Sequence, residues 1–195
     1  MPETGGRPMR ADARRNRDQL LDAAVRAFAS DGADVTLDAI AKTAGVGIGT
    51  LYRHFPTREA LVEAAYRQEL AGLCDAAPSL LRSLPPDKAT RAWMDRFIDY
   101  MTTKRHMAGA LRAVITSGGT LYAESHARLI AAITALLDAG ITAGTLRSDI
   151  EPNDLLVGLS GVSLAAGEPA QREQAGRLLD LLVDGLRHRT TASAH

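Results

Sequence analysis

A run of small residues followed by hydrogen-bonding side chains lies between residues 44 and 54, and its chemistry suits a nucleic-acid duplex. Small or flat residues let a helix backbone approach the bases in a major groove. Here they are Gly47, Ile48, Gly49 and Thr50. The hydroxyl of Tyr52 and the imidazole of His54 can reach phosphate oxygens, and such contacts position a protein on DNA without reading its sequence.

Three side chains of the same run are expected to recognise the bases, namely Ile48, Thr50 and Arg53. Ile48 suits a thymine methyl group and Arg53 suits a guanine edge, whereas Gly47 caps a helix without offering a side chain. Taken without its surroundings, the pair Tyr52 and His54 more often packs at a domain surface. The surrounding motif favours contact with DNA.

Two short helices joined by a glycine turn are predicted to position these residues. Thr36 stands in the N-cap position before apolar residues at helical spacing, at positions 37, 40, 41 and 44. The glycines at 45 and 47 end that helix, and a second runs from Ile48 to Phe55, where Pro56 stops it. This arrangement is a helix-turn-helix over residues 36–55. Two helices begin here, one at Thr36 and one at Thr57 and Arg58. The positive end of each helix dipole favours binding of phosphate.

Residues 36–55, together with residues 57–61, closely resemble the N-terminal DNA-binding domain of the TetR family. The resemblance covers about residues 15–70 and is carried by the core AGVGIGTLYRHF. It implies that Tyr52 and His54 contact phosphate, as does Arg58, where the family commonly has lysine. Arginine keeps the positive charge of lysine, but its guanidinium group is planar and donates several hydrogen bonds in fixed directions, unlike the compact ammonium group of lysine. Gly47 stands where the family often has serine.

The rest of the chain shows helical spacing throughout and no sustained strand alternation. Helices are predicted over residues 16–30, 57 to about 73, 88–104, 108–115 and 122 to about 140, with two more from 152 and 175. The predicted fold is all-α, with about nine helices. Residues 1–14 are expected to form a flexible basic arm, 15–60 the helix-turn-helix domain and 61–190 a helical effector-binding and dimerisation domain. The stretch at residues 144–149 resembles the loop before the family's last two helices.

The overall charge is balanced, with 23 basic and 23 acidic residues, so nucleic-acid binding has to rest on local placement. Residues 1–17 hold five arginines against Glu3 and Asp12. Such a segment is either a disordered, solvated tail or an arm that inserts into the minor groove.

An aromatic stripe in the second domain is the candidate effector site. Its members are Trp93, Phe97, Tyr100, Met101, Leu111, Tyr122 and His126. Stripes at this spacing are ordinarily core, although in the resembled family the ligand cavity is cut into that core. His126 lies among apolar residues of its predicted helix. The simpler interpretation is a core histidine that is hydrogen-bonded within the protein rather than to a ligand. The residue types favour a hydrophobic or planar small molecule over a polyphosphate.

Leucine-rich stripes on the last two helices predict a homodimer interface built as a four-helix bundle. The expected contacts are Leu155, Leu159, Val162, Leu178, Leu182 and Leu186. Gly158 and Gly161 would allow close approach of helices.

Several other classes of function find little support in the sequence. The glycines at 45, 47 and 49 follow a helix rather than a strand, which argues against a nucleotide loop. The five histidines lack metal-ligand spacing and no serine sits in a nucleophile elbow, so neither an enzyme, a metal site nor a cofactor is expected. Cys74 is either a small buried hydrophobe or a redox sensor. The polar start and the absence of a long apolar run predict a cytoplasmic protein without membrane association.

The resemblance implies a repressor that binds a near-palindromic operator as a dimer and leaves it when a small hydrophobic or aromatic effector binds. Two alternatives stay open: a DNA-binding regulator without a small-molecule ligand, and an activator.

Overall fold

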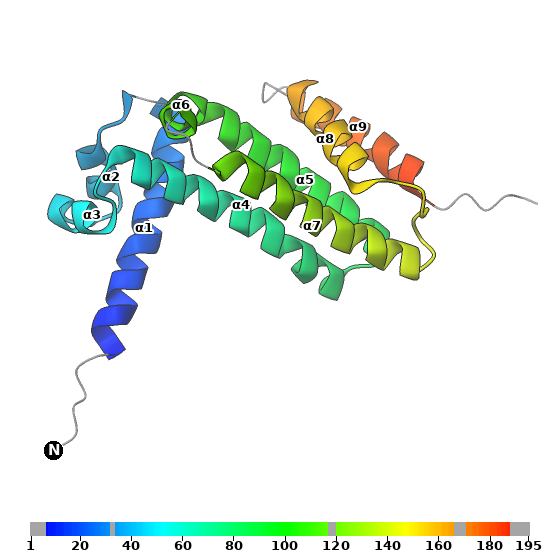
Figure 1. Cartoon of the computed structure of the whole chain (residues 1–195), viewed down its shortest axis with the longest axis horizontal. Coiled ribbons are helices and arrows are strands. Elements are labelled where there is room, and N and C mark those ends of the chain that lie inside the picture. Colours follow the sequence, from blue (N-terminus) through cyan, green and yellow to red (C-terminus); the bar gives the residue numbers. More distant parts are fainter. Residues whose placement is uncertain (1–6, 32–33, 117–119, 166–170, 188–195) are drawn as a thin grey trace, which may run out of the picture. The chain divides into compact units, whose positions relative to one another are not determined.

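The computed structural model describes residues 7–31, 34–116, 120–165 and 171–187, and these fold as nine α-helices (Figure 1). In chain order they are α1 (Arg7–Asp31), α2 (Leu37–Thr43), α3 (Ile48–His54), α4 (Arg58–Ser83), α5 (Pro86–His106), α6 (Ala108–Thr116), α7 (Leu121–Thr142), α8 (Pro152–Ala165) and α9 (Arg172–Leu186). Within the described ranges the only β pairing is an isolated bridge between Leu146 and Arg187. The predicted all-α fold is confirmed.

The helices belong to two compact units. The first comprises Met1–Glu69 and Thr103–Gly119, and the second comprises Leu70–Thr102 and Thr120–His195. The break at Glu69 falls inside α4, as does the predicted domain boundary between residues 60 and 61. Residues 61–69 and 103–119 lie in the first unit, although their predicted place was the second domain.

The core of the first unit gathers one apolar stripe from each of its helices. Leu20, Leu21 and Phe28 of α1 are buried at the spacing that a helix requires. Ile40 of α2 and Leu51 of α3 are fully buried as well. Helix α1 contacts both α2 and α3, so the three form the predicted helix-turn-helix bundle.

Helix α1 begins at Arg7, about two and a half turns before the predicted start at Asn16. Residues 7–14, expected in a flexible arm, are therefore helical. The apolar repeat on which the prediction depended starts only at Leu20, and the preceding turns are polar. Pro8 does not prevent the helix, because a proline in the first turn removes an N–H that has no helical partner there. Residues 1–6 of the predicted arm lie outside the described residues.

Helix α4 continues through Pro78 to Ser83 instead of ending near Leu73. A proline inside a helix removes the hydrogen bond to the carbonyl four residues earlier, at Cys74. Buried residues on both sides of Pro78, Ala77 and Leu80, hold the helix against the core of the second unit. The indole N–H of Trp93 also donates to the carbonyl of Leu73 at 2.9 Å, next to the interrupted turn. Tertiary packing therefore outweighs the local cost of proline.

The segment after α7 folds back through two glycines. Gly144 has φ +68°, and the carbonyl of Gly140 accepts hydrogen bonds from the N–H groups of Thr145 and Leu146. The N–H of Arg147 then donates to the carbonyl of Leu186 at 2.9 Å. This turn ties the end of α7 to the end of α9 within the second unit.

Candidate nucleic-acid interface

The turn between α2 and α3 has the geometry of a helix-turn-helix. The hydroxyl of Thr36 accepts a hydrogen bond from the Ala39 N–H at 3.2 Å, which confirms the predicted N-cap of α2. Gly45 follows with φ +67°, a left-handed conformation that glycine adopts without steric cost. Gly47 then stands as the N-cap of α3 and offers no side-chain hydrogen bond.

Helix α3 divides cleanly into a core face and an outer face. Leu51 is fully buried and Phe55 is 3% exposed, so both hold the helix from behind as expected. The outer face is solvent-exposed at Gly47, Gly49 and Arg53, and it includes Ile48 at 38% and Tyr52 at 49% exposure. This face is shallow because its glycines lack side chains. A major groove can accept such a face.

The predicted phosphate contacts occupy the edges of this face. Tyr52 is exposed, while His54 is half-buried and its ring centroid lies 6.2 Å from that of Phe55. Thr50 is also half-buried. The hydroxyl of Thr57 accepts a hydrogen bond from the Ala60 N–H at 3.1 Å, so Thr57 caps α4 as predicted. Its exposed position places the first turn of α4 on the surface.

The sequence predicts that Arg58 contacts phosphate, and the structure also gives its guanidinium partners within the chain. Its guanidinium donates to the carbonyl of Val35 and lies 5.0 Å from the ring centroid of Phe28. The side chain is half-buried. It therefore joins α4 to α1 and to the segment before α2, and its contact with phosphate stays a prediction.

The predicted effector wall is only partly assembled. Trp93, Phe97 and Tyr100 are buried in the second unit, with ring centroids 5.8 and 6.3 Å apart along the series, and Met101 is half-buried. Leu111 is buried as well, but it belongs to the first unit. The three aromatic rings pack against one another as core residues do.

Tyr122 and His126 do not lie on the apolar face of α7, which corrects the prediction. Tyr122 is 66% exposed, and the exposed His126 ring shares a 3.2 Å hydrogen bond with Asn153. The buried face of α7 starts one residue earlier, at Leu121, and continues through Ser125 and Leu129. A shift of one residue turns a side chain by about 100° around a helix.

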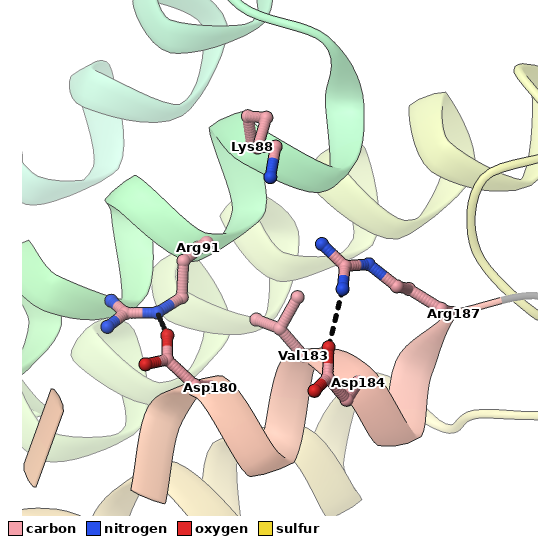
Figure 2. Close-up of a pocket in the computed structure, with 6 residues that line it drawn as sticks. All are labelled: Lys88, Arg91, Asp180, Val183, Asp184 and Arg187. Carbon is pink, nitrogen blue, oxygen red and sulfur yellow. Dashed lines mark hydrogen bonds and ion pairs between the residues drawn. The ribbon is translucent and has the colours of Figure 1, made fainter. Parts of the chain in front are cut away.

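A charged pocket of about 250 Å³ lies between α5 and α9 (Figure 2). Its lining is Lys88, Arg91, Asp180, Val183, Asp184 and Arg187. Arg91 pairs with Asp180 at 2.6 Å and Arg187 pairs with Asp184 at 2.5 Å, while Arg187 also reaches Asp87. Since the charges largely compensate one another, the pocket serves to dock α9 on α5. The sequence does not indicate this pocket, because the ion pairs that join α5 to α9 connect residues 89 and 100 positions apart.

Cys74 is half-buried on α4. Burial is the main cause that raises the pKa of its thiol above the ordinary value. Because the thiolate is the reactive form, this environment favours the interpretation as a packing residue over the redox alternative.

The exposed apolar residues of α8 and α9 differ from those predicted for dimerisation. Leu155, Leu159, Val162 and Leu186 are buried within the chain itself. Leu178 and Leu182 are half-buried, and Leu182 packs towards Gly158, where an added Cβ would lie 3.8 Å from its Cδ2 atom.

The residues that do face outwards were missed by the sequence reading. Val157, Leu164 and Leu181 are 62%, 75% and 69% exposed. A neighbouring groove of about 250 Å³ runs along the same two helices. Its lining is Ile150, Asp154, Leu155, Leu181, Leu182, Gly185 and Leu186. The seven-residue spacing of Val157 and Leu164 indicates that they share one face of α8. Because α8 carries two apolar stripes, the sequence alone does not show which stripe is buried in the core.

Two kinds of feature are absent from the described parts of the chain. None of their helices is both long enough and apolar enough to span a membrane. No group of three or more metal-binding side chains gathers in them.

Both halves of the chain match known families. Residues 20–65 match the model of bacterial regulatory proteins of the tetR family, and residues 85–188 match the C-terminal domain of SbtR-like transcriptional regulators. HTH-type transcriptional regulators of Staphylococcus aureus are 36% identical over 63 residues, which are 32% of this chain and 34% of theirs. The matched region thus spans about a third of the length of these curated relatives.

Solved structures extend the similarity over most of the chain. A TetR transcriptional regulator of Streptomyces coelicolor is 57% identical, covers 88% of this chain and 98% of its own, and has a TM-score of 0.83. A TetR regulatory protein of Mycobacterium vanbaalenii is 33% identical, covers 93% and 100%, and has a TM-score of 0.76. These relatives are regulators, and the chain is not an enzyme. It belongs to the TetR family of DNA-binding transcriptional regulators.

Proposed function

We propose that the protein is a cytoplasmic repressor that binds a near-palindromic operator as a homodimer and is released by a small hydrophobic effector. The observation that carries this proposal is the exposed face of α3, where Ile48 and Tyr52 stay in solvent while Leu51 is fully buried. TetR-family regulators bind DNA operators and dimerise. Two-fold symmetry in the protein requires matching symmetry in its site.

Within this proposal the side chains of α3 divide into two roles. Ile48, Thr50 and Arg53 read base edges, and Tyr52 and His54 contact phosphate groups. The caps at Thr36 and Thr57 supply exposed backbone N–H groups and the positive ends of their helices to the phosphates. Gly47 allows close approach of the backbone.

The dimer is proposed to form through the outer faces of α8 and α9. Val157, Leu164 and Leu181 supply exposed apolar area, and Gly161 and Gly185 on the same helices leave open space that permits close helix packing. A second copy placed on this face covers the apolar groove as well. Burial of such a patch favours association.

The effector is proposed to enter the aromatic core around Trp93, Phe97 and Tyr100, with Met101 at its edge. These rings are closely packed in the second unit, so a ligand has to displace side chains to bind. Binding is then coupled to a change of conformation, and α4, which begins at Arg58 in one unit and ends in the other, is the element that transmits it. A regulator without a ligand, or an activator, is the alternative.

The proposal is tested by measuring duplex binding of two single variants by fluorescence anisotropy. Tyr52→Ala removes a phosphate contact, so its affinity should fall by about five- to tenfold for every duplex. Arg53→Ala should instead reduce the preference for the operator over mismatched duplexes, by about 1–3 kcal/mol for the base that it reads. An unchanged affinity in both variants would refute the assignment of α3 as the recognition helix.

The effector part has its own measurement. A screen of small molecules that follows the melting temperature and duplex release together should find lipophilic or aromatic compounds that also change Trp93 fluorescence. Stabilisation by such compounds without release of the duplex would contradict effector-induced release, and the absence of any stabilising compound would favour the regulator without a small-molecule ligand.

A further inference from the structure

The N-terminal part of α1 is rich in arginine, and its described side chains, at residues 12–19, are mostly exposed. Arg14, Arg15 and Arg17 are exposed, and the first buried residue among residues 12–31 is Leu20. Residues 7–19 hold five arginines and two acidic residues, Asp12 and Asp18. A helix that is polar on all sides gains no stability from a core, so its length calls for another partner.

One contact shows that this arginine-rich part of α1 lies close to α3. The guanidinium of Arg17 lies 5.6 Å from the ring centroid of Phe55, which is the C-cap residue of α3. Arg17 therefore stands beside the end of the recognition helix, inside the same compact unit. Arg14 precedes it by three residues and lies on the same side of α1.

The charges on this side are not neutralised internally. Among the described residues no ion pair engages Arg14 or Arg15, whereas Arg67, Arg91 and Arg172 all have carboxylate partners. Asp12 lies two residues from Arg14 and points to the opposite side of the helix. Asp18 lies one turn from Arg14, yet the two form no ion pair in the described structure.

We propose that the N-terminal turns of α1 are a second DNA-binding surface, which grips the phosphate backbone beside the groove occupied by α3. This inference rests on the proposed operator binding. Arg14 and Arg17 are about 4.5 Å apart along the helix axis, comparable with the spacing of about 3.4 Å between charges on one DNA strand. The surface adds affinity and salt dependence without adding base specificity.

The test compares variants of the full chain in anisotropy titrations over a range of NaCl concentrations. The probes are a duplex selected by the wild-type protein from a random pool and a duplex of unrelated sequence. Arg14→Gln should weaken binding to both duplexes by about five- to tenfold at 0.1 M salt. It should also reduce the slope of log affinity against log salt by about 0.9 for each protomer bound.

Three comparisons make the result decisive. Arg14→Lys keeps the charge and should bind as the wild type does. Arg26→Gln changes an exposed arginine further along the same helix and should have no effect. Melting temperatures should stay unchanged in all three variants, because the side chains are exposed.

The inference would be overturned if Arg14→Gln bound DNA with the affinity and salt slope of the wild type. It would also be overturned if Arg26→Gln lost as much affinity as Arg14→Gln, because such a loss indicates a general effect of charge. A loss confined to the selected duplex would also overturn it, because it indicates base reading. Failure of the wild-type protein to select any duplex would instead count against the proposed function itself.

Discussion

Glu69 is a half-buried carboxylate on α4 whose protonation is linked to the stability of the fold. Burial, and secondly the nearby charge of Asp22, raise its pKa above the ordinary value of 4.5. Between the ordinary and the raised pKa the folded state holds more protons than the unfolded state, so the free energy of unfolding decreases as pH rises through that window.

Glu69→Gln should therefore be more stable than the wild type at pH 7. The difference should shrink as pH falls through the raised pKa towards 4.5, where the wild-type carboxyl becomes protonated in the fold. Urea unfolding curves at several pH values measure this directly. A glutamine variant that is less stable at pH 7 would show that the carboxylate makes a favourable contact.

Residues whose partners are close in sequence were predictable at this scale. Thr36 and Thr57 cap helices through bonds to groups three positions away, and both caps are present. Arg58 was not predictable, because its partners Val35 and Phe28 lie 23 and 30 positions earlier in the chain. Nothing local in the sequence distinguishes an arginine that binds phosphate from one that holds two helices together.

Among the elements, the turn after α7 depends on a glycine that has no room for a side chain. A Cβ atom on Gly140 would lie 2.3 Å from Cδ1 of Leu146 and 2.9 Å from its Cβ, so the backbone would have to move. Gly140→Ala should lower the free energy of unfolding by about 1–3 kcal/mol. Chemical denaturation measures the loss.

Gly72→Ala is the matched control, since Gly72 lies inside α4 with nothing within 4 Å of its added Cβ. Alanine there should stabilise the protein by about 0.5–1 kcal/mol. Equal effects of the two substitutions would mean that the turn adapts and that Gly140 is not required.

Helix identity was predictable from sequence, whereas several helix ends were not. Apolar spacing indicated every helix of the structure, including the two short ones that form the helix-turn-helix. The end of α4 was missed because Pro78 signals a break locally, although burial of Ala77 and Leu80 stabilises the continuing helix. The start of α1 was missed because residues 7–19 carry no apolar repeat.

At the scale of the whole molecule, the exposed apolar residues of α8 and α9 form the proposed dimer interface. Leu181 is 69% exposed and adjoins the apolar groove. Leu181→Glu should give a monomer in sedimentation equilibrium and reduce operator affinity about tenfold or more, because one protomer reads only half of the site.

Ile141→Glu is the control, because Ile141 is an exposed apolar residue on α7 rather than on α8 or α9. It should leave the protein dimeric. A Leu181→Glu protein that still sediments as a dimer would contradict the proposed interface.

The apolar character of α8 and α9 was predictable, but which of their residues face outwards was not. Leucines occur on both sides of α8 and α9, and only the packed structure shows that Leu155 and Leu159 face the chain's own core. The aromatic stripe presents the same difficulty, since Tyr122 and Trp93 have similar chemistry and opposite burial.

The most direct test of the central claim is the sequencing of duplexes that the purified full chain selects from a random pool. A homodimer with α3 as its recognition helix predicts an enriched, near-palindromic motif. Its half-site centres should lie about 34–36 Å apart, or about 10–10.5 base pairs, or a multiple of that spacing. Selection of no motif, or of one asymmetric element without a repeated half-site, would contradict the proposal that two copies read DNA through α3.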